Sequence, residues 1–275
     1  MENFRSLQGG TTIHFLRDQC KTIQASTFKQ VIDALKEILM DVNLEIDETG
    51  IKIVAMDNTH IVLIHLKLEA DKFEIYECEK KIYVGINMLR LHALIKTITN
   101  NDILSLYILK DDPNHLGITI DNNEKNYKTN YKLSVLDIDV LNIQIPPVDF
   151  HTIINMPSSY LQKIIRDMHN LAEFIEFRNI NDKLILSCKG DFCYQETILG
   201  SEKSQSITIK KNSSEEDQEI IQGIFSLKYL SIFTKCTNLS NTVEIYLKNN
   251  YPIILRYTIS SLGEIKICLS QQDIS

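Results

Sequence analysis

Cysteine side chains could bind a metal ion or form disulfides, and their spacing indicates which role this chain favours. The six cysteines are far apart, and no two of them form a CxxC pair. Such scatter predicts reduced, packed side chains and argues against a zinc site or a disulfide framework. The six are Cys20, Cys78, Cys188, Cys193, Cys236 and Cys268.

A second potential group of metal ligands is formed by Asp57, His60 and His65, which are close together in the sequence. These residues fall in a turn and the strand after it, and no fourth ligand accompanies them. We therefore expect no metal site, and we expect His60 to be a hydrogen-bonded structural histidine unless it contacts a partner.

Motifs for enzymatic chemistry are absent from the sequence. It contains no Walker loop, no GxSxG and no HExxH. The acidic pairs Asp111-Asp112 and Asp137/Asp139 fall in segments with the character of loops, where solvation is the default. We expect a protein without intrinsic catalysis and without a cofactor.

The remaining chemical candidates are cations on four amphipathic segments, residues 26–40, 87–98, 158–172 and 226–236, which have apolar residues at helical spacing. The first segment has no net charge, whereas the others carry +2, +1 and +2, a total of +5. Because the whole chain carries −7, the rest carries −12. Basic helices that share one surface would attract phosphate; the alternative is that these cations lie on ordinary solvated helix faces.

The four segments are two copies of one pattern. An offset of about 133 positions carries Phe28 and Val31 onto Leu161 and Ile164, and an offset of about 138 carries the second segment onto the fourth. Ser26 or Thr27, Asn87 and Ser226 are expected N-caps. Strand-like segments separate the helices, for example residues 43–47, 51–56, 103–109, 183–188 and 253–259. The fold class is therefore α+β, with two similar domains of helices and antiparallel strands.

Length and composition set the boundaries of these domains. The 275 residues are 44% hydrophobic and 24% charged, as in ordinary globular proteins, and no apolar run is long enough to span a membrane. No secretory signal is visible, so we expect an intracellular protein. We assign residues 1–19 to an N-terminal extension, 20–126 to the first domain, 127–147 to a connecting loop that ends in Pro146-Pro147, and 148–275 to the second domain. Residues 211–219 are a second hydrophilic loop.

Ordered motifs along the chain now identify a family. They are Gly50-Ile51-Lys52 through Ala55-Met56-Asp57-Asn58-Thr59-His60, Tyr76-Glu77-Cys78-Glu79, Val84-Gly85-Ile86-Asn87, Leu136-Asp137-Ile138-Asp139, Met156-Pro157-Ser158, Arg166-Asp167, and Lys228-Tyr229-Leu230 with Phe233-Thr234-Lys235. In their order and spacing the chain resembles the eukaryotic-type DNA sliding clamps, the proliferating cell nuclear antigen family. The resemblance covers residues from about 20 to about 270.

The resemblance implies a DNA-clamp fold and a processivity factor. Three copies of a two-domain subunit would close into a ring around duplex DNA, with the helices lining the hole and the antiparallel sheets outside. The DNA contacts would be independent of base sequence and weakened by salt. Matching positions, with Arg90 and Lys228 added on charge, are Lys29, Lys36, Arg90, Lys96, Lys163, Arg166, Lys228 and Lys235.

A groove for partner proteins is also implied by the resemblance. DNA polymerase and other replication or repair proteins would insert a short motif with apolar anchors. The residues expected to line this groove are Met56, His60, Leu63, Ile143, Ile145, Pro146, Pro252 and Leu269. For Met56, Leu63 and Leu269 the alternative is plain core packing.

Ring closure would join strand edges of two subunits. By resemblance, residues 115–120 of one subunit pair with residues 206–210 of the next, and the interface residues are His115, Ile118, Ile120, Ile207 and Ile209. The alternative is that both segments are ordinary strands within one subunit.

The chain departs from the family pattern at several positions. Cys268-Leu269-Ser270-Gln271 stands where the family often has Tyr-Leu-Ala-Pro, and Gln30 and Ala93 stand where it often has lysine. The turn Asn181-Asp182-Lys183 differs from that of the family's modified lysine, so that regulation is not carried over.

Two functions remain open at this level. The first is a homotrimeric clamp that an ATP-dependent loader places on double-stranded DNA, in the nucleus or, for a viral protein, at a viral replication site. The second is a subunit of a heterotrimeric checkpoint-type clamp, or a specialised clamp such as a viral paralogue, acting in repair or transcription. Neither reading involves a membrane.

Overall fold

The computed structural model describes residues 16–22, 24–122, 124–140, 143, 148–180, 182–200, 206–211 and 220–272. The N-terminal half (residues 16–134) contains β1 (Leu16–Thr22), α1 (Ala25–Leu35), β2 (Asp41–Asp47), β3 (Gly50–Met56), β4 (Val62–Glu69), the 3₁₀ turn η1 (Ala70–Lys72), β5 (Ile75–Cys78), β6 (Ile82–Asn87), α2 (Met88–Ile95), β7 (Ile103–Leu109), β8 (Asp112–Asn122) and β9 (Tyr127–Ser134).

The C-terminal half (residues 152–269) contains β10 (Thr152–Pro157), α3 (Ser158–His169), β11 (Phe174–Ile180), β12 (Lys183–Lys189), β13 (Tyr194–Gly200), β14 (Thr208–Lys211), β15 (Ile221–Ser226), α4 (Leu227–Phe233), the 3₁₀ helix η2 (Thr234–Asn238), β16 (Thr242–Leu247), β17 (Ile253–Ile259) and β18 (Gly263–Leu269).

The two halves have the same topology. Each has a five-stranded antiparallel sheet, in the orders β5-β1-β7-β8-β9 and β14-β10-β16-β17-β18. Each half also has a four-stranded antiparallel sheet, with the strand order β4-β3-β2-β6 in the N-terminal half and β13-β12-β11-β15 in the C-terminal half. The duplicated α+β fold predicted from the sequence is confirmed.

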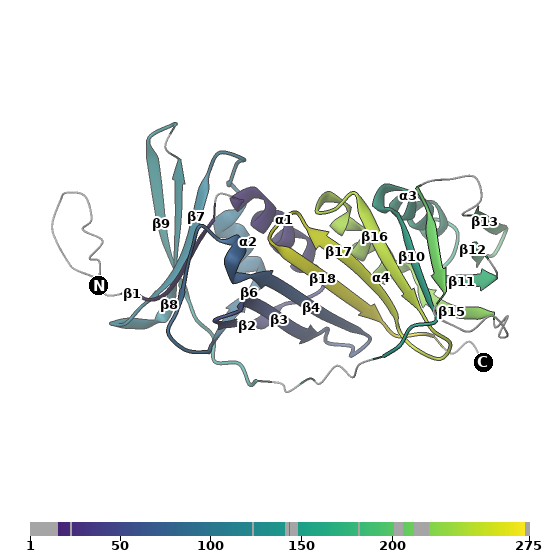
Figure 1. Cartoon of the computed structure of the whole chain (residues 1–275), viewed down its shortest axis with the longest axis horizontal. Helices are drawn as coiled ribbons and strands as arrows, with labels where there is room; N and C mark the ends of the chain where they lie inside the picture. Colours follow the sequence, from purple (N-terminus) through teal and green to yellow (C-terminus); the bar gives the residue numbers. More distant parts are fainter. Residues whose placement is uncertain are drawn as a thin grey trace.

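One strand pair joins the halves. β18 runs antiparallel to β4, from Gly263 opposite Leu68 to Leu269 opposite Val62. The five-stranded sheet of the C-terminal half thereby continues into the four-stranded sheet of the N-terminal half as one nine-stranded sheet, seen across the middle of Figure 1.

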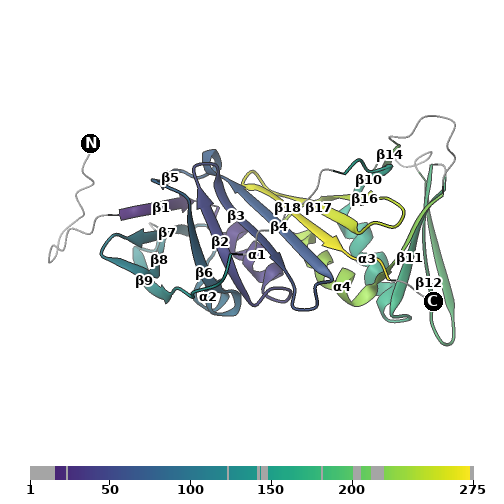
Figure 2. The same ribbon diagram turned by 90° about the horizontal axis from the view of Figure 1, so that it is seen from below.

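The helices follow one another along the molecule, α2 and α1 in one half and α4 and α3 in the other (Figures 1 and 2). We call α1–α4 and η2 the helix layer. Phe28 and Leu35 of α1, like Leu161 and Met168 of α3, are buried toward the sheets. Each such side chain contributes about 1.5–3 kcal/mol by burial, which orients the helices and turns their polar positions outward. No helix in the described part of the chain is long and apolar enough to cross a membrane.

The helix caps follow the sequence only in part. Asn87 caps α2, and its side chain accepts a hydrogen bond from the Arg90 amide at 3.0 Å, as predicted. Ser226 precedes α4 as predicted but makes no side-chain cap bond. The first helix begins at Ala25, so its N-cap is Gln24 and not Ser26 or Thr27.

Two of the predicted domain boundaries are wrong. Residues 127–134, which we had assigned to the connecting loop, form β9 and pair with β8. The segment predicted as an N-terminal extension ends inside β1. The true connector starts after Ser134 and first follows β6, where Leu136 and Gly85 form an isolated bridge. The predicted loop at 211–219 lies outside the described residues apart from Lys211, which ends β14.

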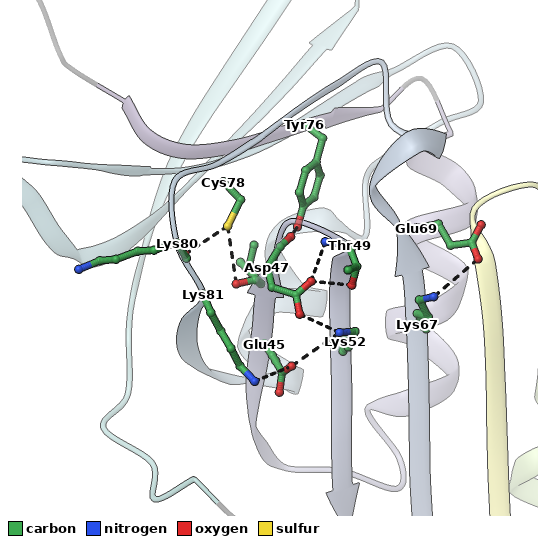
Figure 3. Close-up of polar contacts among 11 residues, drawn as sticks. Glu45, Asp47, Thr49, Lys52, Lys67, Glu69, Tyr76, Cys78, Lys80 and Lys81 are labelled. Atoms are coloured by element: carbon green, nitrogen blue, oxygen red, sulfur yellow. Dashed lines mark hydrogen bonds and ion pairs between the residues drawn. The ribbon is translucent and has the colours of Figure 1, made fainter.

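A polar cluster fixes the outer surface of the N-terminal half (Figure 3). Asp47 accepts hydrogen bonds from the Thr49 amide at 2.7 Å and from Lys52 at 2.7 Å. Burial by itself would raise the pKa of Asp47, but the hydrogen bonds from Lys52 and Thr49 outweigh it and lower this pKa to about 2. Tyr76 donates to the Asp47 carbonyl at 2.7 Å, which ties β5 to the turn between β2 and β3.

Candidate DNA-facing and partner-binding surfaces

The basic residues expected to face DNA all lie in the helix layer or at its helix ends. Arg90, Lys163, Arg166, Lys228 and Lys235 are exposed on α2, α3, α4 and η2. Exposed Lys96 is the C-cap of α2, half-buried Lys36 is the C-cap of α1, and half-buried Lys29 lies within α1. Because the apolar faces of the helices point at the sheets, the exposed cations point away from them.

Four of these cations already have partners within the chain, and the weakest such contact joins Arg166 Nε to Asp167 Oδ1 at 3.8 Å. Lys29 donates from Nζ to the Ile98 carbonyl at 2.5 Å, which ties α1 to the end of the α2 segment. The Lys36 ammonium lies 2.5 Å from Asp33 Oδ1. Lys235 on η2 forms an ion pair with Glu37, which follows α1. The helix layer is therefore less basic in practice than its count of lysines and arginines indicates.

His92 joins the same network from α2. Its Nε2 lies 3.0 Å from Asp33 Oδ1 and 3.3 Å from Lys36 Nζ. The hydrogen bond from Lys36, aided by the nearby charges of His92 and Lys235, lowers the pKa of Asp33. Asp33 therefore stays ionised at neutral pH, in contact with two cationic or potentially cationic groups.

Two of the predicted groove residues, Met56 and Leu63, lie on the outer face of the nine-stranded sheet together with two residues that were not predicted. Met56 lies opposite Leu63, which lies opposite Cys268, and Cys268 lies opposite Ile254. These four side chains are half-buried and form one apolar row over the outer face of β3, β4, β18 and β17. Half-buried Pro252 stands directly before β17.

The prediction that Leu269 lines the groove is wrong. Its side chain is fully buried in the core, so it cannot line a surface groove. Successive strand residues point to opposite faces of a sheet, and it is the preceding residue, Cys268, that shares the outer face with Leu63. The sequence prediction missed Cys268 and Ile254; the alternation in Glu264–Leu269 was the signal that could have found Cys268.

His60 is exposed in the loop between β3 and β4, with φ at 58°. The loop is organised by Asp57, whose carboxylate accepts from the Val62 amide at 2.8 Å and the Ile61 amide at 3.0 Å. Burial would raise the pKa of Asp57, but hydrogen bonds from Thr59, Val62 and Ile61 lower it. The loop geometry is thus held by an ionised, nearly buried carboxylate.

The connector supplies only part of the predicted groove. Ile143 is half-buried. Ile145 and Pro146 lie outside the described residues. Upstream, Asn43 of β2 donates to the Ile138 carbonyl at 3.0 Å and holds the start of the connector against the sheet.

The predicted subunit interface is wrong for β8. His115–Ile120 pairs with β7 on one side and β9 on the other, so this strand offers no edge to a neighbour. Ile118 and Ile120 are buried, and so is Ile207. His115 hydrogen-bonds Asp112 at 2.6 Å, and half-buried Ile209 lies on β14, which pairs with β10. Within the described residues, the sheet edges left without a strand partner are those of β5, β6, β9, β13, β14 and β15.

Comparison with protein families identifies the fold. Residues 19–142 match the proliferating cell nuclear antigen N-terminal domain, and residues 144–272 match the C-terminal domain of the same family. Together the two matches cover nearly the whole chain.

Individual relatives agree with the family match. "Probable DNA polymerase sliding clamp 1" of Paramecium bursaria Chlorella virus 1 is 37% identical over 254 residues, which cover 91% of this chain and 95% of the relative. The proliferating cell nuclear antigen of Chaetomium thermophilum is 31% identical over 250 residues, covering 90% and 95%. The crystal structure of the proliferating cellular nuclear antigen of Entamoeba histolytica matches with a TM-score of 0.85 at 25% identity. The match covers 94% of this chain and 100% of the Entamoeba chain. The chain therefore belongs to the proliferating cell nuclear antigen family of DNA sliding clamps.

Proposed function

We propose that three copies of this chain close into a ring around duplex DNA, and that the ring tethers a DNA polymerase and other replication or repair proteins. The observation that carries the proposal is the junction of β18 with β4. It joins the five-stranded sheet of one half to the four-stranded sheet of the other. The equivalent strands are β9 and β13, and each has one edge without a strand partner within the described residues. A junction that repeats between equivalent halves of successive copies generates a ring when its rotation closes.

The internal repeat also supplies a register for this second junction. Leu199 in β13 pairs with Leu184 as Leu68 in β4 pairs with Ile51. Tyr127 in β9 likewise corresponds to Gly263 in β18. Tyr127 pairs with the last residue of β8, and Gly263 pairs with the last residue of β17. Since Leu68 lies opposite Gly263 within the chain, Tyr127 would lie opposite Leu199 of the next subunit. One position further along this ladder, Lys128 would face Ile198 on the outer side of the sheet, as Glu264 faces Lys67 within the chain.

The helix layer would line the hole of the ring. Its exposed cations stand on a chain whose overall charge is −7, so phosphate would be attracted to this layer and repelled elsewhere. Contacts of Lys and Arg with phosphates do not depend on base sequence, and a ring held by them and by its topology can slide. We propose Arg90, Lys96, Lys163, Arg166 and Lys228 as direct contacts, with Lys29, Lys36 and Lys235 limited by their internal partners.

Partner proteins would dock on the outer face at the apolar row Met56, Leu63, Cys268 and Ile254, next to His60, Pro252 and the connector. A short segment with apolar anchors suits such a half-buried surface. An ATP-dependent loader would open the ring. The clamp itself would carry out no catalysis and would act in the nucleus, or at a replication site if the chain is viral.

Solution mass and retention on DNA test this proposal together. Light scattering should give about three times the subunit mass of 31.7 kDa across a concentration series. Loaded clamps should stay on closed circular duplex DNA and leave when the circle is cut, because topology holds them. A mass that stays at one subunit would contradict the homotrimer and favour a heterotrimeric clamp; equal retention on circular and linear DNA would contradict the encircling ring.

A further inference from the structure

The inner surface assigned above has one helix without net positive charge, α1, and the internal repeat makes this visible. On α3 the outward positions carry Lys163 and Arg166, both exposed. The positions of α1 that match them at the repeat offset carry Gln30 and Asp33, and Glu37 follows one turn later. The outward basic residues of α3 are therefore replaced by neutral and acidic residues at the equivalent positions of α1.

These carboxylates are engaged with cations of the same surface. Asp33 lies 2.5 Å from Lys36 and 3.0 Å from His92, and Glu37 forms an ion pair with Lys235. By contrast, Arg90, Lys96 and Lys163 form no ion pair with another described residue. The helix layer thus contains cations without an ion pair and two lysines, Lys36 and Lys235, that are already neutralised by carboxylates from the α1 segment.

We propose that Asp33 and Glu37 act as internal surrogates for DNA phosphates, which hold Lys36 and Lys235 until a phosphate displaces them and which thereby limit how tightly the clamp grips DNA. The inference rests on the proposed function, in which the helix layer faces DNA. Both acceptors are anionic oxygens that suit a lysine ammonium, so a carboxylate can exchange with a phosphate without leaving the ammonium bare.

The energetics fit an exchange of this kind. The side chain of Asp33 is 56% exposed and that of Glu37 is 39% exposed, so each ion pair is largely solvated and contributes little to stability. Such pairs are weak enough to open as DNA slides past. They also lower the number of counterions that DNA binding releases, because Lys36 and Lys235 are neutralised before contact.

The test uses two double variants. The first combines the isosteric substitutions Asp33→Asn and Glu37→Gln, and the matched control combines Glu69→Gln and Asp71→Asn. The control removes the same two charges from exposed ion pairs with Lys67 and Lys72, away from the helix layer; Glu69 and Lys67 are drawn in Figure 3. Affinity for a short linear duplex is measured over a range of salt concentrations, and diffusion along long DNA is followed by single-molecule imaging.

We expect the Asp33/Glu37 variant to bind about three- to tenfold more tightly at low salt, with a steeper salt dependence of affinity and slower diffusion. Lys36→Gln should remove part of the gain in the variant and have little effect in the natural chain. The control should stay within about twofold of the natural chain.

The outcomes separate the two proposals. Equal affinities and salt slopes for the variant and its control would overturn the role of Asp33 and Glu37. A natural trimer without salt-dependent affinity for duplex DNA would instead overturn the DNA-facing helix layer itself. Thermal unfolding of all the variants checks that the fold is retained.

Discussion

Gly263 and Leu68 lie opposite each other where the two halves of the chain meet, and the backbones are so close there that a Cβ atom at residue 263 would lie 2.0 Å from the Lys67 carbonyl oxygen. The first pair of the internal junction therefore depends on the absence of a side chain. The junction proposed between subunits has Tyr127 at the equivalent place, which is 38% exposed in the single chain. The two junctions share a topology but need different side chains at this end.

Gly263→Ala should weaken the internal junction. The added methyl group must push against backbone and not against a flexible side chain, so we expect a loss of about 1–3 kcal/mol in the free energy of unfolding. Gly200→Ala is the matched control, because a Cβ atom at residue 200 meets nothing within 4 Å. Denaturant unfolding followed by circular dichroism measures both; equal stabilities of the two variants would show that the close approach at Gly263 carries no cost.

The stability of the N-terminal half should depend on the ionisation of Asp47. Its pKa is lowered to about 2 in the folded chain, so its contribution is fully present above the ordinary aspartate pKa of about 4 and is lost as the pH falls toward 2. Asp47→Asn should therefore unfold more easily at neutral pH, by about 1–3 kcal/mol, because Lys52 and Thr49 in Figure 3 lose a charged acceptor. The difference from the natural chain should shrink as the pH falls from 4 to 2.

Melting temperatures over that pH range provide the measurement, with Asp71→Asn as the exposed control. A difference between Asp47→Asn and the natural chain that stays constant down to pH 2 would show that the Asp47 carboxylate is not the titrating group.

Charge at position 198 should decide whether subunits associate. Ile198 is 57% exposed on the free edge strand β13, and the proposed register places Lys128 of the next subunit opposite it. Ile198→Lys would set two like charges opposite each other and should favour monomers, whereas Ile198→Glu would pair with Lys128 and keep the trimer. Both variants lose the same apolar side chain, so their difference isolates the charge. Light scattering over a dilution series reads the outcome, and equal dissociation of the two variants would exclude this register.

The apolar row should be necessary for partner binding. Leu63 lies between Met56 and Cys268 on the outer face and is half-buried, so Leu63→Lys should retain the fold and reduce binding of an apolar clamp-binding peptide by about tenfold or more. Lys67→Gln, further along the same strand and face, is the control. Fluorescence anisotropy with a labelled peptide measures the affinity. Unchanged affinity of Leu63→Lys would move the partner site away from this row.

The sequence by itself determined the helices, most of the strands and the duplication. Burial of the apolar stripes of α1 and α3 follows from 3.6-residue spacing, which is a local property. The strands that we did not predict include β9 and β13, and the reason is physical. Both are the outermost strands of their sheets, so Tyr127–Ser134 and Tyr194–Gly200 carry polar side chains and have the composition of a loop.

Only the tertiary structure decided which side chains meet. Register decided that Cys268 and not Leu269 lies on the outer face, since a shift by one residue in a strand exchanges its faces. Packing decided that β8 is an interior strand and that, among the strands of the described residues, β9 and β13 lie at the ends of their sheets. Charges could be counted along the chain, but the pairing of Lys235 with Glu37, 198 residues away, depends on the approach of η2 to α1. A pattern local to one element can be read from the sequence, whereas a contact between distant elements exists only once the chain has folded.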